Sequence, residues 1–344
     1  MRVDLMTMGT TLRQTGALAK EAADAGFSGA LITESGRTAY LSCAAIALMA
    51  DIDILTGIAV AFPRSPMITA SNAWELAEAS NGRFRLGIGT QVRAHIERRY
   101  SSEFDPPGPR LREYVEAVRH IFKAFRGEKL DFQGKYWQMS LLPAAWSPGP
   151  IPVPDPPIDI AAVNPWMLRM AGEVADGVHV HPLNSPTYLR ETVQPSVAEG
   201  AKAAGRDASD VQLIVPVFTA PGDTPEARAT WWERARFQVA FYGSTPNYGF
   251  IFDQLGAEGT TPRIREKQKA GDLNGMAQVV TDDVLAHFCV ACPWDELSDR
   301  LVERLDGVAD RVVSYFTAAQ YAEDPSSLAR WGEVARDVVA RTGG

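Results

Sequence analysis

The chain has 344 residues, of which 46% are hydrophobic and 22% are charged, as is usual for a soluble globular protein. Its net charge of −8 argues against a nucleic-acid surface, because phosphate binding needs a basic face. No stretch reaches the roughly 18 uninterrupted apolar residues of a membrane helix, and MRVDLMTM lacks the apolar core of a secretion signal. Three cysteines suit a reducing compartment, so we expect a cytoplasmic protein. We also expect a small-molecule substrate.

Helical stretches that end in glycine alternate with short apolar strands along the chain. Gly26, Gly82, Gly177 and Gly307 stand where helices commonly stop in a left-handed conformation. The strands are nearly continuous in apolarity, as expected for parallel strands covered on both faces. We expect strands at 3–8, 27–33, 54–61, 83–89, 158–163, 178–181, 212–218 and 308–316.

About eight βα units at this length predict an α/β fold, a (β/α)8 TIM barrel that forms one domain over residues 1–344. A doubly wound open sheet is the alternative, because periodicity does not show whether a sheet closes. Insertions are expected at about 127–157, which holds a small hairpin and a proline-rich loop, and at about 245–280. In a barrel, such insertions usually gather on the C-terminal face and shape the site.

The residues that follow the strands form a polar rim of mixed charge, which suits a polar ligand with some negative charge. Several familiar sites are missing. Gly87-Ile88-Gly89 lacks the third glycine of a dinucleotide fingerprint, and no phosphate loop, HExxH helix or GxSxG elbow occurs.

Two pairs of residues leave a metal or redox site open. His179 and His181 are two apart on a strand and therefore share a face, but no carboxylate accompanies them in sequence. Cys289 and Cys292 form a CxxC without a second CxxC or a thioredoxin-like unit. We expect no metal, one histidine in contact with a ligand, and buried structural cysteines.

Four segments resemble the luciferase-like flavin and deazaflavin enzymes, more closely the branch that uses coenzyme F420. They are TGIAVAFPRSPMITASNAWELAEASNGRFRLGIGTQVRAHIERRY (56–100), REYVEAVRHIFKAF (112–125), IDIAAVNPWMLRMAGEVADGVHVHP (158–182) and QVAFYGSTPNY (238–248). The resemblance covers most of the chain and implies a (β/α)8 barrel with insertions.

The resemblance also implies a cofactor site at the ends of the strands. It places a non-proline cis peptide at Ala59–Val60 and the segment after the fourth strand under the cofactor ring. The residues implied to bind the cofactor are Thr33, Ala59, Val60, Gly89, Thr90, Gln91, His95, Ala162, Val163, Asn164, His181, Pro182, Leu183, Asn184 and Ser185. Asn164-Pro165 also starts a helix, whose free N–H groups suit an anion.

The chain departs from the family at the usual base. The histidine that many F420 dehydrogenases carry after the second strand is absent here, where Thr33-Glu34-Ser35 stands. Loss of the base matters less if the enzyme delivers a hydride to an activated C=C or C=N bond. In that reaction Glu34 or His95 is the candidate catalytic proton donor. Aromatic residues of the rim and insertions are candidates to bind the substrate: Phe62, Trp137, Tyr242 and Tyr248.

We therefore expect an F420-dependent oxidoreductase, served by a separate cofactor-reducing enzyme. An FMN-dependent monooxygenase that uses reduced flavin and O2 is the first alternative, and a non-catalytic flavin-binding protein is the second. The charged tail of F420 would be bound by basic groups, and the candidates are Arg37, Arg64 and Arg93. Relatives often form dimers, so a homodimer is also expected, although no motif tests it.

Overall fold

The computed structural model describes residues 1–343, and its centre is a closed parallel barrel. Strands β1, β2, β3, β5, β8 and β9 follow one another around it, and β10 and β12 complete the circle by pairing with β9 and β1. The predicted TIM barrel is therefore confirmed. Each of the eight expected strands is present, with one change: the stretch 54–61 divides into β3 and a short β4 that pairs with β5.

The strands are β1 Arg2–Thr7, β2 Gly29–Ile32, β3 Asp53–Thr56, β4 Ala59–Val60, β5 Phe84–Gly89, β6 Phe132–Gln133, β7 Gln138–Met139, β8 Ile158–Ala162, β9 Gly177–Val180, β10 Gln212–Pro221, β11 Cys289–Cys292 and β12 Arg311–Ser314. The helices that follow the first five barrel strands and their loops are α1 Leu12–Ala25, α2 Ala39–Ala47, α3 Pro66–Ala79, α4 Arg93–Arg98, α5 Pro107–Phe125 and α6 Pro165–Val174. The remaining helices are α7 Pro186–Tyr188, α8 Gln194–Ala203, α9 Pro225–Gly243, α10 Gly249–Asp253, α11 Thr260–Lys269, α12 Leu273–Gln278, α13 Asp282–Leu285, α14 Leu297–Leu305, α15 Thr317–Glu323 and α16 Ser327–Thr342.

Glycine stops three of the four expected helices in the predicted way. Gly26, Gly82 and Gly307 have φ values of 115°, 81° and 71°. Gly177 was wrongly predicted as a helix stop, because α6 already ends at Val174 and Gly177 opens strand β9. An added Cβ at position 177 would lie 2.5 Å from Asp159 Oδ1 on the neighbouring strand β8, so the packing leaves no room for a side chain.

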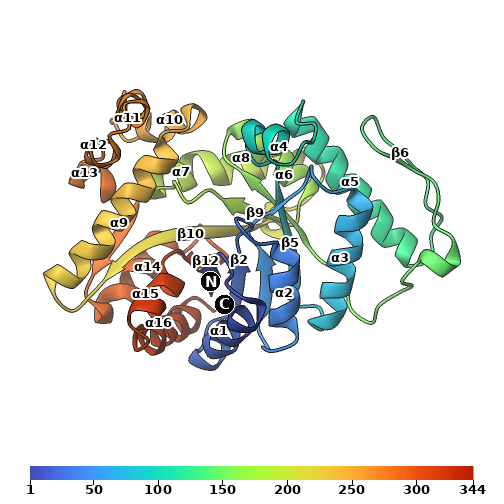
Figure 1. Ribbon diagram of the computed structural model, residues 1–344, viewed down its shortest axis with the longest axis horizontal. Helices are drawn as coiled ribbons and strands as arrows, with labels where there is room; N and C mark the ends of the chain where they lie inside the picture. The colour runs from blue at the N-terminus through green and yellow to red at the C-terminus, as the bar shows by residue number, and fades with distance from the viewer. Residues whose placement is uncertain (344) are drawn as a thin grey trace.

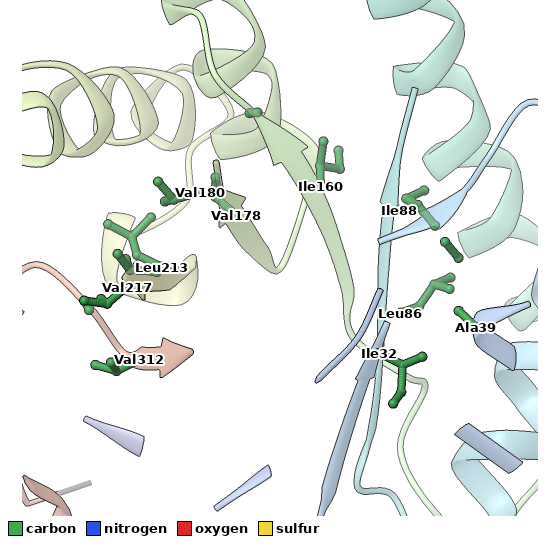
Figure 2. Close-up of a cluster of buried hydrophobic side chains, with 14 of the residues drawn as sticks. Ile32, Ala39, Leu86, Ile88, Ile160, Val178, Val180, Leu213, Val217 and Val312 are labelled. Atoms are coloured by element: carbon green, nitrogen blue, oxygen red, sulfur yellow. The ribbon is translucent and has the colours of Figure 1, made fainter. Parts of the chain in front are cut away.

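Alternate strand residues build two separate apolar layers, since successive side chains of a strand point to opposite faces. The larger layer joins strands to helices, and Figure 2 shows part of it, with side chains from several strands such as Ile32, Ile88 and Val312. The smaller layer, inside the barrel, consists of Leu31, Leu55, Ile214 and Val313 with Met6 packed against it.

The two insertions lie at opposite sides of the barrel (Figure 1). Helices α10–α13 stand over the end of α9, whereas the β6–β7 hairpin lies outside α5. Glu113 of α5 accepts the backbone N–H groups of Lys135, Tyr136 and Trp137 at 2.8, 2.6 and 2.9 Å, which fixes the hairpin there. The hairpin stays close to the loop after β4, because the Arg110 guanidinium lies 5.4 Å from the ring of Trp137 and 5.9 Å from that of Phe62. The expectation that both insertions gather on the C-terminal face stays a prediction.

The two ends of the described chain meet, since the Met1 amino group donates to Thr342 Oγ1 at 2.6 Å. None of the helices within residues 1–343 combines the length and the hydropathy that a membrane crossing requires.

Candidate active site

Charged side chains fill the end of the barrel where the strands begin. Arg311 donates to both carboxylate oxygens of Asp4 at 2.7 Å and to Asp53 at 2.9 Å, and Arg85 donates to Asp159 at 2.6 and 3.0 Å. A cavity of about 910 Å³ opens at this end. Because the arginines of this layer are paired and no aromatic residue lines the cavity, we place the candidate site at the opposite end, where parallel barrels carry their chemistry.

His179 lies inside the barrel between these two ends. It is 7% exposed, and its Nε2 is 3.8 Å from Asp159 Oδ2 without a hydrogen-bond partner in the described residues. Burial lowers the pKa of His179 to about 4, and this effect outweighs the attraction of Asp159. Gly87 makes room for the ring, because an added Cβ would lie 2.3 Å from Nε2. His179 is therefore a neutral core histidine.

The loop after β2 holds the chain between β3 and β4. Thr33 Oγ1 donates to the carbonyl oxygen of Gly57 at 3.0 Å, and Glu34 accepts the N–H of Val60 at 2.7 Å. Arg64 pairs with both oxygens of Glu34 and donates to the carbonyl of Val60 at 2.8 Å. The structure thus brings together Thr33, Glu34 and Val60, and it adds Arg64 to them.

The cis peptide in this segment is Gly57–Ile58, so the prediction of Ala59–Val60 is wrong by two residues. Side-chain packing explains why glycine stands at 57. An added Cβ would lie 2.3 Å from the side chain of Leu31. Ala59 and Val60 instead form strand β4, where they pair with Ile88 and Gly89.

Small residues face the barrel mouth beside this segment. An added Cβ at Gly89 would lie 3.1 Å from the side chain of Ile58 and 3.3 Å from Cβ of Ala161. Ile58, Gly89 and Ala161 therefore lie close together, and two of the three have little or no side chain. Apolar residues of this kind are typical of the lining of a cofactor site.

The segment after β5 turns outward into α4. Gln91 has a φ of 56°, its Oε1 accepts the N–H of Val92 at 3.0 Å, and Thr90 Oγ1 donates to the Gln91 carbonyl at 3.0 Å. His95 is exposed on α4. Arg99 donates to the carbonyl of Ser35 at 2.6 Å, so the arginine-rich end of this segment ties it to the loop after β2.

Two of the three arginines expected to bind a charged tail already have carboxylate partners. Arg64 pairs with Glu34, and Arg93 pairs with Asp105 and Glu97. Arg37 is exposed and has no ion pair within residues 1–343.

The polar side chains after β8 and β9 mainly fix the loops. Asn164 and Ser185 cap α6 and α7 by accepting N–H groups at 3.0 and 3.1 Å, which confirms that Asn164-Pro165 starts a helix. Asn184 donates to the carbonyls of His181 and Pro216 at 2.9 and 2.8 Å, which joins this loop to β10. The carbonyl of Val163 accepts the hydroxyl of Tyr188 at 2.5 Å.

Four of the expected cofactor residues have side chains that are buried in the protein. Their side chains belong to the hydrophobic core: Ala59, Val60, Ala162 and Leu183. Pro182, in the same loop as Leu183, is half-buried.

His181 sits in a cup of aromatic rings. Its ring lies 4.7 Å from that of Tyr242 and 4.6 Å from that of Tyr248, between centroids. Its Nδ1 accepts the N–H of Leu183 at 3.1 Å, so the proton of the neutral ring is on Nε2. Burial lowers the pKa of His181 to about 3, which keeps the ring neutral near pH 7.

The other two expected substrate residues form a separate group. Phe62 and Trp137 lie on either side of Arg110, whose guanidinium is 5.9 and 5.4 Å from their ring centroids. Phe62 and Trp137 therefore both lie near the Arg110 cation, whereas Tyr242 and Tyr248 both contact the ring of His181.

Tyr315 was missed by the sequence interpretation. It follows β12 directly, its hydroxyl is 2.5 Å from that of Tyr242, and its ring is 4.6 Å from that of Phe218. The signal was present: Arg311, Val313 and Tyr315 alternate along one strand, and the first two face the barrel interior.

The cysteine pair lies away from this mouth on β11, and both thiols are free and buried. Burial raises the pKa of Cys292 to about 11, so the thiol rather than the thiolate is present near pH 7. No group of His, Cys, Asp or Glu with the spacing of a metal site occurs within residues 1–343.

The chain matches the family described as luciferase-like monooxygenase over residues 1–311. It is 38% identical over 296 residues to an uncharacterized protein of Mycobacterium tuberculosis, which covers 86% of this chain and 87% of the other. It is 28% identical over 307 residues to 5,10-methylenetetrahydromethanopterin reductase of Archaeoglobus fulgidus, again covering 86% and 87% of the two chains.

Solved structures of similar fold cover nearly the whole chain. The coenzyme F420-dependent tetrahydromethanopterin reductase of Methanopyrus kandleri has a TM-score of 0.80 at 22% identity and covers 99% of both chains. An F420-dependent secondary alcohol dehydrogenase has a TM-score of 0.72 at 16% identity and covers 98% of both chains. At these identities the likeness concerns the fold.

Proposed function

Because the chain belongs to the luciferase-like monooxygenase family, we propose that it is an F420-dependent oxidoreductase that transfers a hydride between the deazaflavin C5 and a small organic substrate. The observation that carries this proposal is the barrel mouth. There, the small apolar residues around Ile58 and Gly89 are combined with the neutral donors His181 and Tyr242. The reductase of Archaeoglobus fulgidus, at 28% identity, supports a reduction.

The residues at the mouth fit a planar cofactor with a polar tail. Ile58, Gly89 and Ala161 would support the ring, and the backbone of the segment 89–91 would run beside it. The backbone N–H groups at the start of α6 and α7 would serve an anionic group, because helix N-termini carry partial positive charge. When bound, F420 would supply the hydride chemistry itself.

This chain's own residues would position the ligands and handle protons. Glu34 has both oxygens engaged by Arg64 and the Val60 N–H, so we assign it to holding the β4 segment in place. His95 is exposed on α4 and remains the candidate to exchange a proton with water. His181 keeps its proton on Nε2 and would donate a hydrogen bond as a neutral ring.

An FMN-dependent monooxygenase is the second candidate, and one observation favours it. The charged tail of F420 needs free cations, yet Arg64 and Arg93 are already paired, which leaves Arg37. FMN lacks that tail and carries only a phosphate, which the helix N-termini would serve. Under the first proposal a separate enzyme reduces the cofactor, and a cytoplasmic homodimer also remains a prediction.

The test is turnover under defined electron donors. The protein is mixed without oxygen with reduced F420 and a panel of cyclic enones and imines, and reoxidation of the cofactor is followed by absorbance. We expect substrate-dependent reoxidation. Oxygen consumption with reduced FMN, without turnover of reduced F420, would instead establish the monooxygenase.

A further inference from the structure

A pair of phenols stands at the barrel mouth. Tyr242 comes from α9 and Tyr315 directly follows β12, and their hydroxyl oxygens are 2.5 Å apart. Either hydroxyl can be the donor. Because this one hydrogen bond uses only one of the two protons, the second O–H is free for another acceptor. The side chains are half-buried rather than sealed.

The surroundings of the pair are aromatic. The ring of Tyr315 packs on Phe218 at 4.6 Å, and the ring of Tyr242 packs on His181 at 4.7 Å. Burial raises the pKa of both tyrosines, so they stay protonated donors near pH 7. The free O–H and the Nε2–H of His181 are therefore two donors within one aromatic cluster at the ends of the strands.

We propose that the Tyr242–Tyr315 pair donates a hydrogen bond to the carbonyl oxygen of a flat, uncharged substrate in which that carbonyl is conjugated to a C=C bond. The aromatic rings suit a flat, uncharged molecule. The free O–H has no acceptor within residues 1–343, so it favours a ligand that carries one, such as a carbonyl oxygen. This inference rests on the proposed function and names its substrate class.

The pair also explains how such a substrate is activated. A C–H bond forms at the carbon distant from the carbonyl while the C=C π bond breaks, and the electron pair moves onto the carbonyl oxygen. The tyrosine O–H stabilises that negative oxygen, as donors do in oxyanion holes. A proton from water then completes the adjacent carbon, and a reduced deazaflavin is the two-electron donor.

The experiment uses coumarin, a flat conjugated carbonyl compound, and naphthalene, which has the same two-ring size but no acceptor. Binding of each to the whole protein, loaded with oxidised F420, is measured in the wild type, Tyr242→Phe, Tyr315→Phe and the double variant. Tyr321→Phe is the matched control, because its hydroxyl binds Glu21 on α1, outside the barrel. The carbonyl stretch of ¹³C-labelled coumarin is recorded in the same complexes.

We expect the double variant to bind coumarin about three- to tenfold more weakly, the effect of one lost neutral hydrogen bond, with naphthalene unchanged. The carbonyl stretch should move to higher frequency in the double variant and stay unchanged in Tyr321→Phe. Replacing both partners by phenylalanine should leave the fold intact, because it removes donor and acceptor together.

Three results would overturn the inference: no coumarin binding by the wild type, an unshifted carbonyl stretch in the double variant, or an equal loss of naphthalene binding. If the double variant lost F420 affinity instead, the pair would belong to the cofactor. Failure of the proposed function is distinct from these, because then the wild type would prefer FMN to F420 or bind neither cofactor.

Discussion

Single residues in the barrel interior show how burial sets the protonation of histidine here. His179 and His181 are two apart on one strand and one loop, and both face inward. Burial lowers the pKa of each, yet only His181 has a ring nitrogen that faces the aromatic cup. The sequence predicted that one of the two contacts a ligand, and this part of the site stays a prediction.

His179 should make the fold sensitive to mild acid. Its folded pKa of about 4 lies below the ordinary value of 6.5, so the unfolded chain takes up a proton first as the pH falls. The stabilising effect is complete above pH 6.5 and is lost as the pH falls from 6.5 to about 4, by on the order of 3 kcal/mol.

Urea unfolding at several pH values would measure this slope. His181, whose pKa is about 3, adds to the slope in the same window, so His179→Gln should reduce the slope by about half. His287→Gln, at an exposed position, should leave it unchanged. An equal slope in wild type and His179→Gln would show that other groups cause the acid sensitivity.

The ion pair of Glu34 and Arg64 should contribute to stability as a buried pair. Their side chains are 3% and 17% exposed. Glu34→Gln leaves the Arg64 charge without its partner, so we expect a loss of about 3–5 kcal/mol in the free energy of unfolding. Glu97→Gln, which breaks an exposed pair with Arg93, should cost less than about 1 kcal/mol.

The double variant Glu34→Gln, Arg64→Met separates positioning from proton donation. Because it removes the unpaired charge, it should recover most of the stability. If Glu34 only positions the segment, cofactor binding should recover partly with it. A stable double variant that binds cofactor but transfers no hydride would instead make Glu34 the proton donor.

Many polar side chains in the loops after the strands bind other parts of the protein and so fix the loops. The loop after β2 and the β4 segment are joined by Thr33, Glu34 and Arg64. The side chains of three further residues form hydrogen bonds within the protein, at helix caps or to a neighbouring strand: Asn164, Asn184 and Ser185. Several polar side chains that the sequence offered as ligand contacts are therefore already bonded within the protein, and the loops they belong to stay a prediction of the ligand site.

The strands themselves were predictable because each carries its own local signal. A short, nearly continuous apolar run indicates a buried parallel strand, and all eight predicted runs belong to the barrel. The cis peptide was misplaced because no local pattern distinguishes Gly57–Ile58 from Ala59–Val60. The contact that requires glycine at 57 comes from Leu31, on another strand.

Over the whole molecule, the candidate site depends on contacts between distant parts of the chain. Tyr242 and Tyr315 are 73 residues apart, and the rings around His181 come from α9 (Tyr242) and from the following insertion (Tyr248). Such pairings depend on how the barrel closes, which periodicity does not encode. The hairpin is likewise held by a distant residue, because Glu113 on α5 accepts the Tyr136 N–H (Figure 1).

The measurement that tests the central claim most directly is a titration of the purified protein with F420 and with FMN, followed by quenching of its eight tryptophans. Our account predicts tight binding of F420 and much weaker binding of FMN. Preference for FMN, or binding of neither, would contradict it.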